Sequence, residues 1–240
     1  MREAAGMLTF DHRNKSFGKD ADGYVRGEGA AAIVLQRSDL RSYLKETEED
    51  DDCCNQPPPQ IYAKVLSSAV NQDGRSASFT APNGISQQEL LRNALSHSAI
   101  LPHQVDYLEA HGTGTSLGDP VEFGAIQEVL LARKNGSSVT VENEQPLIIG
   151  AVKSNIGHLE GAAGLAGILK AVLSLKNGQV PRSLHNEALN PLIDLHEEGY
   201  RPVLFPQQAV PLKKDAIVGV ISCLFHINVR HTCATNKRRC

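Results

Sequence analysis

The sequence predicts an α/β fold, and two observations support this prediction. In residues 105–136, and again in residues 146–178, a short apolar strand is followed by a polar or Gly-rich loop and then by a helix. In addition, 41% of the 240 residues are hydrophobic, which is enough to build one large core or two small ones. We therefore expect strands and helices to alternate along most of the chain.

The N-terminal region predicts one strand followed by an interruption. Residues 30–37 form an apolar run after a Gly-rich turn, which is typical of a buried strand. Residues 45–60 combine an acidic run with three prolines, which favours an exposed loop or a disordered insertion. A carboxylate metal cluster in this block is much less favoured, because its acidic residues lack a regular ligand spacing.

A strand and a capped helix are predicted next. Residues 61–70 have a strand-like pattern, and Ser86 with Glu89 three residues later forms a capping-box signature. We expect this pair to begin a helix over residues 87–99.

The first complete unit begins with an apolar strand over residues 105–110 and continues through a Gly-rich loop. Asp119, Pro120 and Glu122 then match the residue preferences of the N-cap, N1 and N3 positions of a helix. We expect this helix to end near Gly136, because glycine favours the end of a helix.

The second unit repeats this order, with a buried strand over residues 146–152, a polar loop over residues 153–160 and a helix that Gly178 ends. Glycines recur in this helix at a spacing of three, at Gly161, Gly164 and Gly167. Because glycine weakens a helix, this spacing indicates that one face packs very closely against another backbone. We expect a buried central helix.

Composition limits the classes of partner and the compartment. The formal net charge of −3 gives no positive field for nucleic acid or an anionic membrane, so small molecules or proteins are the expected partners. The N-terminus lacks an apolar run of the signal-peptide type, and no stretch approaches the roughly 18 apolar residues of a membrane span. The five cysteines fit neither a disulfide framework nor a C-x-x-C metal site. We therefore expect a cytoplasmic protein in a reducing compartment.

Two histidines are candidate reactive groups, because each unit places one past the carboxyl end of its strand: His111 and His158. Either one alone is as well explained by a structural role, but two in equivalent places indicate a shared site. A neutral imidazole donates from one nitrogen while the other accepts, so a pair can stabilise an enolate or a thioester oxyanion. Lys153, in the loop of His158, could orient a carboxylate or keep a nearby histidine neutral, and its alternative is a solvated loop charge.

Other motif interpretations fail on spacing. Residues 112–115 begin like a dinucleotide-binding G-x-G-x-x-G loop, but Leu117 stands in the place of the third glycine. The sequence contains no G-K-[ST] loop and no H-E-x-x-H pair. We expect neither a bound dinucleotide nor a metal ion.

Two long motifs resemble the histidine motifs of β-ketoacyl synthase domains: EAHGTGTSLGDP at residues 109–120 and KSNIGHLE at residues 153–160. Residues 20–31, DADGYVRGEGAA, resemble the segment that follows the nucleophile region in this family, and residues 71–84, NQDGRSASFTAPNG, are similar to the version in type I polyketide synthases. The resemblance covers about residues 6–221. It implies a thiolase-like layered αβαβα fold, present here as the C-terminal half with the end of the N-terminal half.

The resemblance implies an acyltransferase reaction, the decarboxylative Claisen condensation of acyl and malonyl-type thioesters on an acyl carrier protein. His111 and His158 would promote decarboxylation of the extender unit and stabilise the enolate, with support from Lys153. Thr113 and Thr115 would contact the phosphopantetheine arm of the carrier protein, so no cofactor would be bound directly by the chain. A second ketosynthase chain would be a partner, because these enzymes are dimers.

Two features depart from the family pattern. The family's nucleophilic cysteine lies in a T-A-C-S-S-like stretch upstream of the DGYVRGEG segment, and this chain begins after the place for it. The family's G-F-G-G-T-N-A-H turn is replaced by LFHINVRH at residues 224–231. Phe225 keeps the aromatic residue of that turn, whose backbone N–H would serve an oxyanion hole, but the glycines that permit positive φ are gone.

These observations divide the chain into four parts. They are residues 1–44, the end of the N-terminal ketosynthase half; residues 45–60, the acidic and Pro-rich insertion or loop; residues 61–222, the C-terminal half with both histidine motifs; and residues 223–240, a divergent tail. One hypothesis is a ketosynthase fragment of a polyketide synthase, inactive alone because the nucleophile segment is missing. The alternative is a non-catalytic module that binds acyl carrier protein or pairs with a complete ketosynthase.

Overall fold

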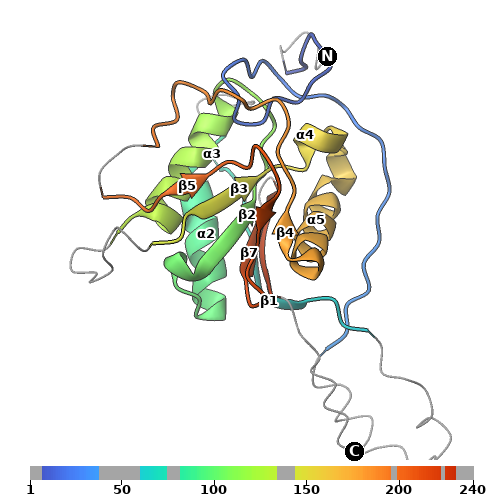
Figure 1. The fold of residues 1–240 in the computed structure, drawn as a ribbon, viewed down its shortest axis with the longest axis vertical. Helices are drawn as coiled ribbons and strands as arrows, with labels where there is room; N and C mark the ends of the chain where they lie inside the picture. Colours follow the sequence, from blue (N-terminus) through green and yellow to red (C-terminus); the bar gives the residue numbers. More distant parts are fainter. Residues whose placement is uncertain are drawn as a thin grey trace, which may run out of the picture.

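The centre of the fold is a six-stranded mixed sheet (Figure 1). A computed structural model describes residues 7–37, 60–74, 82–133, 144–195, 199–222 and 225–230. The strand order is β1-β8-β7-β2-β3-β5. The strands are β1 (Lys64–Val70), β2 (Val105–Glu109), β3 (Leu147–Gly150), β5 (Val203–Leu204), β7 (Ile217–Ser222) and β8 (Phe225–Arg230). Strands β7, β2, β3 and β5 are parallel, whereas β8 is antiparallel to both β7 and β1.

Helices cover both faces of this sheet, with α2 and α3 on one side and α5 on the other (Figure 1). The helices are α2 (Gly84–Ser98), α3 (Gly118–Ile126), α4 (Lys153–Ile156) and α5 (Ala163–Asn177). Single helical turns lie at η2 (Pro102–Gln104), η3 (Gln127–Leu131) and η5 (Glu160–Ala162), and β4 (Gln179–Val180) pairs with β6 (Val210–Pro211). The predicted α/β class is confirmed. None of the described helices is both long and apolar enough to span a membrane.

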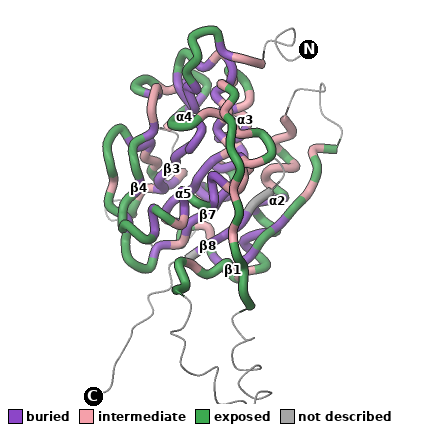
Figure 2. Tube along the Cα trace, turned by 90° about the vertical axis from the view of Figure 1, so that its right-hand side faces the viewer, coloured by how far each residue is buried: buried purple, intermediate pink, exposed green. Residues whose placement is uncertain are grey.

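The alternation of side chains along each strand builds the two cores. In β2, Leu108 packs in the core beneath α2 and α3, whereas its neighbour Tyr107 packs in the core beneath α5. Ile149 and Ile148 of β3 divide in the same way. Both faces of these central strands are therefore buried, as Figure 2 shows by the purple trace through the middle of the molecule.

Residues 30–37 do not form the predicted strand. They run along the outside of the molecule, where the side chain of Val34 is 97% exposed and that of Leu35 is 71% exposed (Figures 1 and 2). A strand requires a neighbour for its N–H and C=O groups, and no strand in the described part of the chain pairs with this run. Apolar composition alone therefore misled the prediction.

The predicted start of α2 was also wrong. Asn83 is the N-cap, and its side-chain oxygen accepts hydrogen bonds from the backbone N–H groups of Ile85 and Ser86. The hydroxyl of Ser86 instead donates to the backbone oxygen of Asp73. Asn and Ser are both good N-caps, so local preference could not choose between two candidates three residues apart.

The first strand–loop–helix unit is confirmed, but its helix ends early. Regular α-helix stops at Ile126 and a π-helical turn follows to Leu131, after which Ala132 takes an extended conformation and bridges to Tyr200. The expected end at Gly136 lies outside the described residues, as does the block at residues 45–59.

The second unit matches its prediction more closely. Gly178 ends α5 in the left-handed conformation, with φ of 65°. Gly164 and Gly167 face β7, as expected from close packing, whereas Gly161 has no heavy atom near the position of a Cβ. One face of α5 is buried and the other exposes Leu169 and Leu173, so the helix is buried on one side only.

Candidate active site

The carboxyl edge of the parallel strands brings the two predicted histidines together. His111 follows β2 directly, and His158 lies between α4 and η5 in the loop region after β3. Their rings meet edge to face, with centroids 5.6 Å apart and planes at 88°. Both residues are half-buried, so the pair lies near the surface of the molecule rather than deep in its core.

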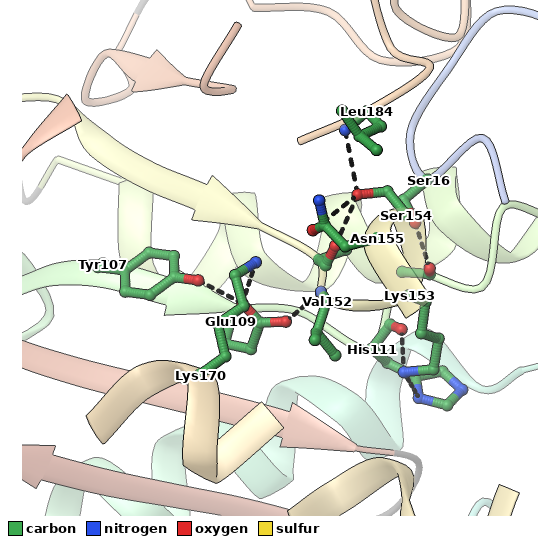
Figure 3. A network of polar contacts seen from close by, with 12 residues as sticks. Ser16, Tyr107, Glu109, His111, Val152, Lys153, Ser154, Asn155, Lys170 and Leu184 are labelled. Carbon is green, nitrogen blue, oxygen red and sulfur yellow. Dashed lines mark hydrogen bonds and ion pairs between the residues drawn. The ribbon is translucent and has the colours of Figure 1, made fainter. Parts of the chain in front are cut away.

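Lys153 fixes the tautomer of His111. Its Nζ donates a hydrogen bond to the backbone oxygen of His111 at 2.5 Å and lies 3.4 Å from the ring Nδ1 (Figure 3). An ammonium group can only donate, so Nδ1 must accept and the ring proton must be on Nε2. Burial, and then the positive charge of Lys153, hold the pKa of His111 well below its ordinary value, which keeps this imidazole neutral.

A backbone group fixes the tautomer of His158 in the same sense. The N–H of Glu160, a residue with φ of 50°, donates to the Nδ1 of His158 at 2.9 Å. Nδ1 is therefore an acceptor and Nε2 carries the proton. Both imidazoles thus present an Nε2–H donor, which is the requirement for binding one oxyanion from two sides.

Two buried carboxylates hold the loop that carries His111. Glu122 accepts hydrogen bonds from the backbone N–H groups of His111 and Gly112, at 2.7 and 2.8 Å. Asp119 accepts from the N–H groups of Gly114 and Phe17, at 3.0 and 2.6 Å. The prediction that these two acids cap their own helix was wrong, since the N-cap of α3 is Leu117, which has no side-chain cap.

Burial governs the ionisation of both carboxylates. It raises the pKa of Asp119 to about 7, although the N–H group of Phe17 opposes the rise. It also raises the pKa of Glu122, against the effect of the backbone donors in the His111 loop. Both acids accept hydrogen bonds from backbone N–H groups, and both are almost fully buried.

The N-terminal segment clamps both histidine loops. Ser16 donates from its hydroxyl to the backbone oxygen of Gly112 at 2.6 Å. The backbone N–H of His158 donates to the oxygen of Val25 at 2.7 Å, and the N–H of Gly27 donates back to the oxygen of His158 at 3.0 Å. The ring of Tyr24 packs 5.1 Å from that of His158.

The predicted pantetheine contacts and oxyanion residue lie at the same edge of the sheet. Thr113 and Thr115 are half-buried on the loop after His111, with hydroxyl oxygens 3.3 Å apart. Phe225 begins β8 opposite Ser222, beyond the point where β7 pairs with the last residue of β2. The side chain of Phe225 lies outside the described residues, and the ligands of these three residues remain predictions.

Sequence reasoning missed the residues that support the histidines. Asp119 and Glu122 were recognised only as helix caps, and Glu109 only as a letter in a motif. A usable signal existed, because Glu122 stands in the otherwise apolar stretch VEFGAI, where a carboxylate is buried only if it has partners. All five cysteines lie outside the described residues. Within the described residues, no group of His, Cys, Asp or Glu is arranged to hold a metal ion.

Comparison with known proteins agrees with this geometry. The model of the β-ketoacyl synthase C-terminal domain matches residues 62–187, and that of the β-ketoacyl synthase N-terminal domain matches residues 1–40. A component of the phenolphthiocerol/phthiocerol polyketide synthase of Mycobacterium tuberculosis is 46% identical over 78% of the chain, and erythronolide synthase EryA3 of Saccharopolyspora erythraea is 44% identical over 79%. The chain spans 8% and 5% of the lengths of these two relatives.

Solved ketosynthase structures share the fold. The oxazolomycin ketosynthase domain OzmH KS7 of Streptomyces albus superposes with a TM-score of 0.77 at 33% identity, covering 95% of this chain and 38% of that domain. The ketosynthase from module 6 of the bacillaene synthase of Bacillus subtilis gives a TM-score of 0.77 at 30% identity, covering 96% of this chain and 38% of that structure. The described strands and helices therefore correspond to a part of such domains.

Proposed function

The chain belongs to the β-ketoacyl synthase family, and we propose that it supplies the decarboxylating side of a polyketide ketosynthase site. The observation that carries this proposal is the pair of imidazoles with matched tautomers. His111 and His158 each have an occupied Nδ1, and their rings lie edge to face with centroids 5.6 Å apart. We propose that the Nε2–H groups of both rings face the substrate. Two such donors suit the oxygen of a thioester whose negative charge grows during reaction.

The proposed reaction begins with a malonyl-type thioester. The bond between its carboxylate carbon and the α-carbon breaks, CO₂ leaves, and the electron pair moves onto the thioester oxygen as an enolate. The Nε2–H groups of His111 and His158 stabilise that oxygen, while Lys153 holds His111 in place and keeps it neutral. The enolate carbon then attacks the carbonyl carbon of an acyl thioester. A carbon–carbon bond forms, the C–S bond of that thioester breaks and its thiolate leaves, which completes a Claisen condensation.

We assign the acyl-carrying thiol to the complete condensing domain rather than to the described residues. A thiolate must hold the acyl group before condensation, and the cysteines of this chain all lie outside the described part. The proposal for this site is therefore decarboxylation, which needs an oxyanion-binding pair and no acylated thiol. The substrate would arrive on the phosphopantetheine arm of an acyl carrier protein, with Thr113 and Thr115 beside its path, as their half-exposed positions allow.

Decarboxylation of malonyl-loaded acyl carrier protein tests the proposal. We expect His158→Ala to lower the rate of acetyl-thioester formation by about 10²-fold or more, because it removes one of two oxyanion donors. His103→Ala, which changes an exposed histidine in η2, is the matched control and should leave the rate unchanged.

Mass spectrometry of the carrier protein gives the measurement. Equal rates for the wild-type chain and His158→Ala would show that the imidazole pair does not promote decarboxylation. Carrier-protein binding without any decarboxylation by the wild-type chain would instead identify a binding module.

A further inference from the structure

A fully buried carboxylate lies directly beneath the candidate site. Glu109 is the last residue of β2, and its side chain points to the α5 side of the sheet with no exposed surface. The hydroxyl of Tyr107 and the backbone N–H of Val152 both donate to this carboxylate, and the Nζ of Lys170 forms an ion pair with it at 2.8 Å (Figure 3). These partners come from β2 itself, from the turn between β3 and α4, and from α5.

Two glycines make room for this network. A Cβ at Gly150 would lie 3.0 Å from the Tyr107 hydroxyl and 3.2 Å from the Lys170 Nζ. A Cβ at Gly167 would lie 3.5 Å from the Cγ of Glu109 and 3.1 Å from Val220. The space around the Glu109 carboxylate is therefore tightly packed on both the β3 side and the α5 side, and the charged groups have no room to rearrange.

Stability alone is a poor explanation for this pair of charges. Removing a carboxylate and an ammonium from water costs several kcal/mol for each ion, and apolar residues of similar volume often serve a core as well or better. The partners of Glu109 indicate another role, because Val152 directly precedes Lys153 of the site and Lys170 lies in α5, the helix that follows the loop of His158.

The carboxylate and its partners lie close in sequence to two of the site residues, and α5 follows the loop of the third. Glu109 is two positions before His111, and Val152 is the residue before Lys153. Lys170 lies in α5, the helix that follows the loop of His158. A single carboxylate thus joins the end of β2, the turn that precedes Lys153 and helix α5.

We propose that Glu109 is a positioning residue that, by binding the N–H of Val152, holds the Nζ of Lys153 against His111. Its significance for catalysis rests on the proposed function, but its effect on His111 is measurable without any catalysis.

The test compares two double variants that differ only in whether position 109 has a hydrogen-bond acceptor. Glu109→Gln/Lys170→Met keeps an oxygen for Val152, whereas Glu109→Leu/Lys170→Met removes it, and neither leaves a buried charge without a partner.

The readout is the pKa of His111, followed by NMR titration of histidine-labelled protein. In the leucine variant the N–H of Val152 loses its hydrogen-bond acceptor, so Lys153 is no longer held beside His111. We therefore expect the His111 pKa to rise to the level found in Lys153→Met. In the glutamine variant we expect it to stay as low as in the wild-type chain. The control Tyr107→Phe removes only the hydroxyl and should leave the His111 pKa unchanged.

Hydrogen exchange on the unmodified chain covers the case in which a variant does not fold. The N–H of Val152 should exchange as slowly as the amides of the central strands, because its acceptor is sealed in the core. Equal His111 pKa values in the two folded double variants, or exchange of Val152 as fast as that of exposed loop amides, would overturn the proposal. Absence of decarboxylation in the wild-type chain and in every variant would instead count against the proposed function. The His111 pKa and the exchange rate of Val152 would still test the role of Glu109.

Discussion

At the scale of single residues, the chemistry depends on which nitrogen atom donates a hydrogen bond to the Nδ1 of each imidazole. At His111 this atom is a lysine nitrogen, and at His158 it is a backbone nitrogen. The group that donates to Nδ1 is therefore easier to alter at His111 than at His158, since only at His111 does it belong to a side chain. A substitution at Lys153 changes the charge beside His111, whereas at position 160 only proline would remove the backbone N–H that orients His158.

Asp119 gives a pH-dependent prediction. Its pKa is raised by burial to about 7, whereas an unfolded aspartate titrates near 4, so folding takes up a proton between these values. The stability that this group contributes is complete below about pH 4 and is lost as the pH rises through about 7. The free energy of unfolding of the wild type, relative to that of Asp119→Asn, should fall by on the order of a few kcal/mol from pH 4 to pH 8.

Urea unfolding at a series of pH values measures this difference. Asp20→Asn, which makes the same carboxyl-to-amide change at an exposed position, is the control. A flat difference for Asp119→Asn would mean that the buried carboxyl does not take up a proton on folding.

Residue roles could be predicted only in part. His111, His158 and Lys153 were found because each stands in a loop after a recognisable strand, and the structure brings all three together. The roles of Glu109 and Asp119 could not be read, because they depend on which backbone donors the fold places around a buried oxygen. A sequence pattern indicates burial, but it does not identify partners far along the chain, such as Val152 for Glu109, 43 positions away.

At the scale of elements, the two strand–loop–helix units show which signals were sufficient. Periodicity predicted β2, β3 and α5, because strongly apolar segments have few alternatives once they are buried. The beginning of α2 was misjudged, since helix boundaries depend on small differences between neighbouring caps. The prediction of a strand at residues 30–37 failed for a different reason. A strand forms only where another strand lies beside it, and the residues of one segment do not show whether such a neighbour exists.

At the scale of elements, replacing either of two glycines with alanine should change the free energy of unfolding, in opposite directions. Gly178 ends α5 with φ of 65°, so Gly178→Ala should lower the free energy of unfolding by about 1 kcal/mol. Gly124 lies inside α3 with open space where a Cβ would stand, so Gly124→Ala should raise it by about 0.5–1 kcal/mol.

The two variants serve as controls for each other, since each adds one methyl group. Chemical denaturation of both proteins checks the signs. A gain in stability for Gly178→Ala would show that the left-handed end of α5 is not required in solution.

At the scale of the whole molecule, the run at residues 30–37 places apolar groups on the outside. Two large apolar side chains, Val34 and Leu35, lie mostly in solvent. Exposed apolar residues that adjoin one another favour contact with other surfaces, including other copies of the chain.

We expect Val34→Lys/Leu35→Gln to reduce concentration-dependent self-association. The free energy of unfolding should change by less than about 0.5 kcal/mol, because neither side chain is buried. Sedimentation velocity over a range of concentrations measures the first effect and urea unfolding the second. Gln36→Lys adds the same charge without removing an apolar group, and equal self-association in both variants would assign the effect to charge rather than to apolar contact.

The clamp of the N-terminal segment on the histidine loops has a consequence for the order of folding. Its hydrogen bonds join residues that are far apart in the chain, 96 positions between Ser16 and Gly112 and 102 between Phe17 and Asp119. Closing such long loops costs chain entropy, so contacts of this kind form late, after neighbouring strands and helices have assembled. We therefore expect the sheet to form first and the two imidazoles to become a working pair only when the N-terminal segment docks, which makes assembly of the site the closing event of folding.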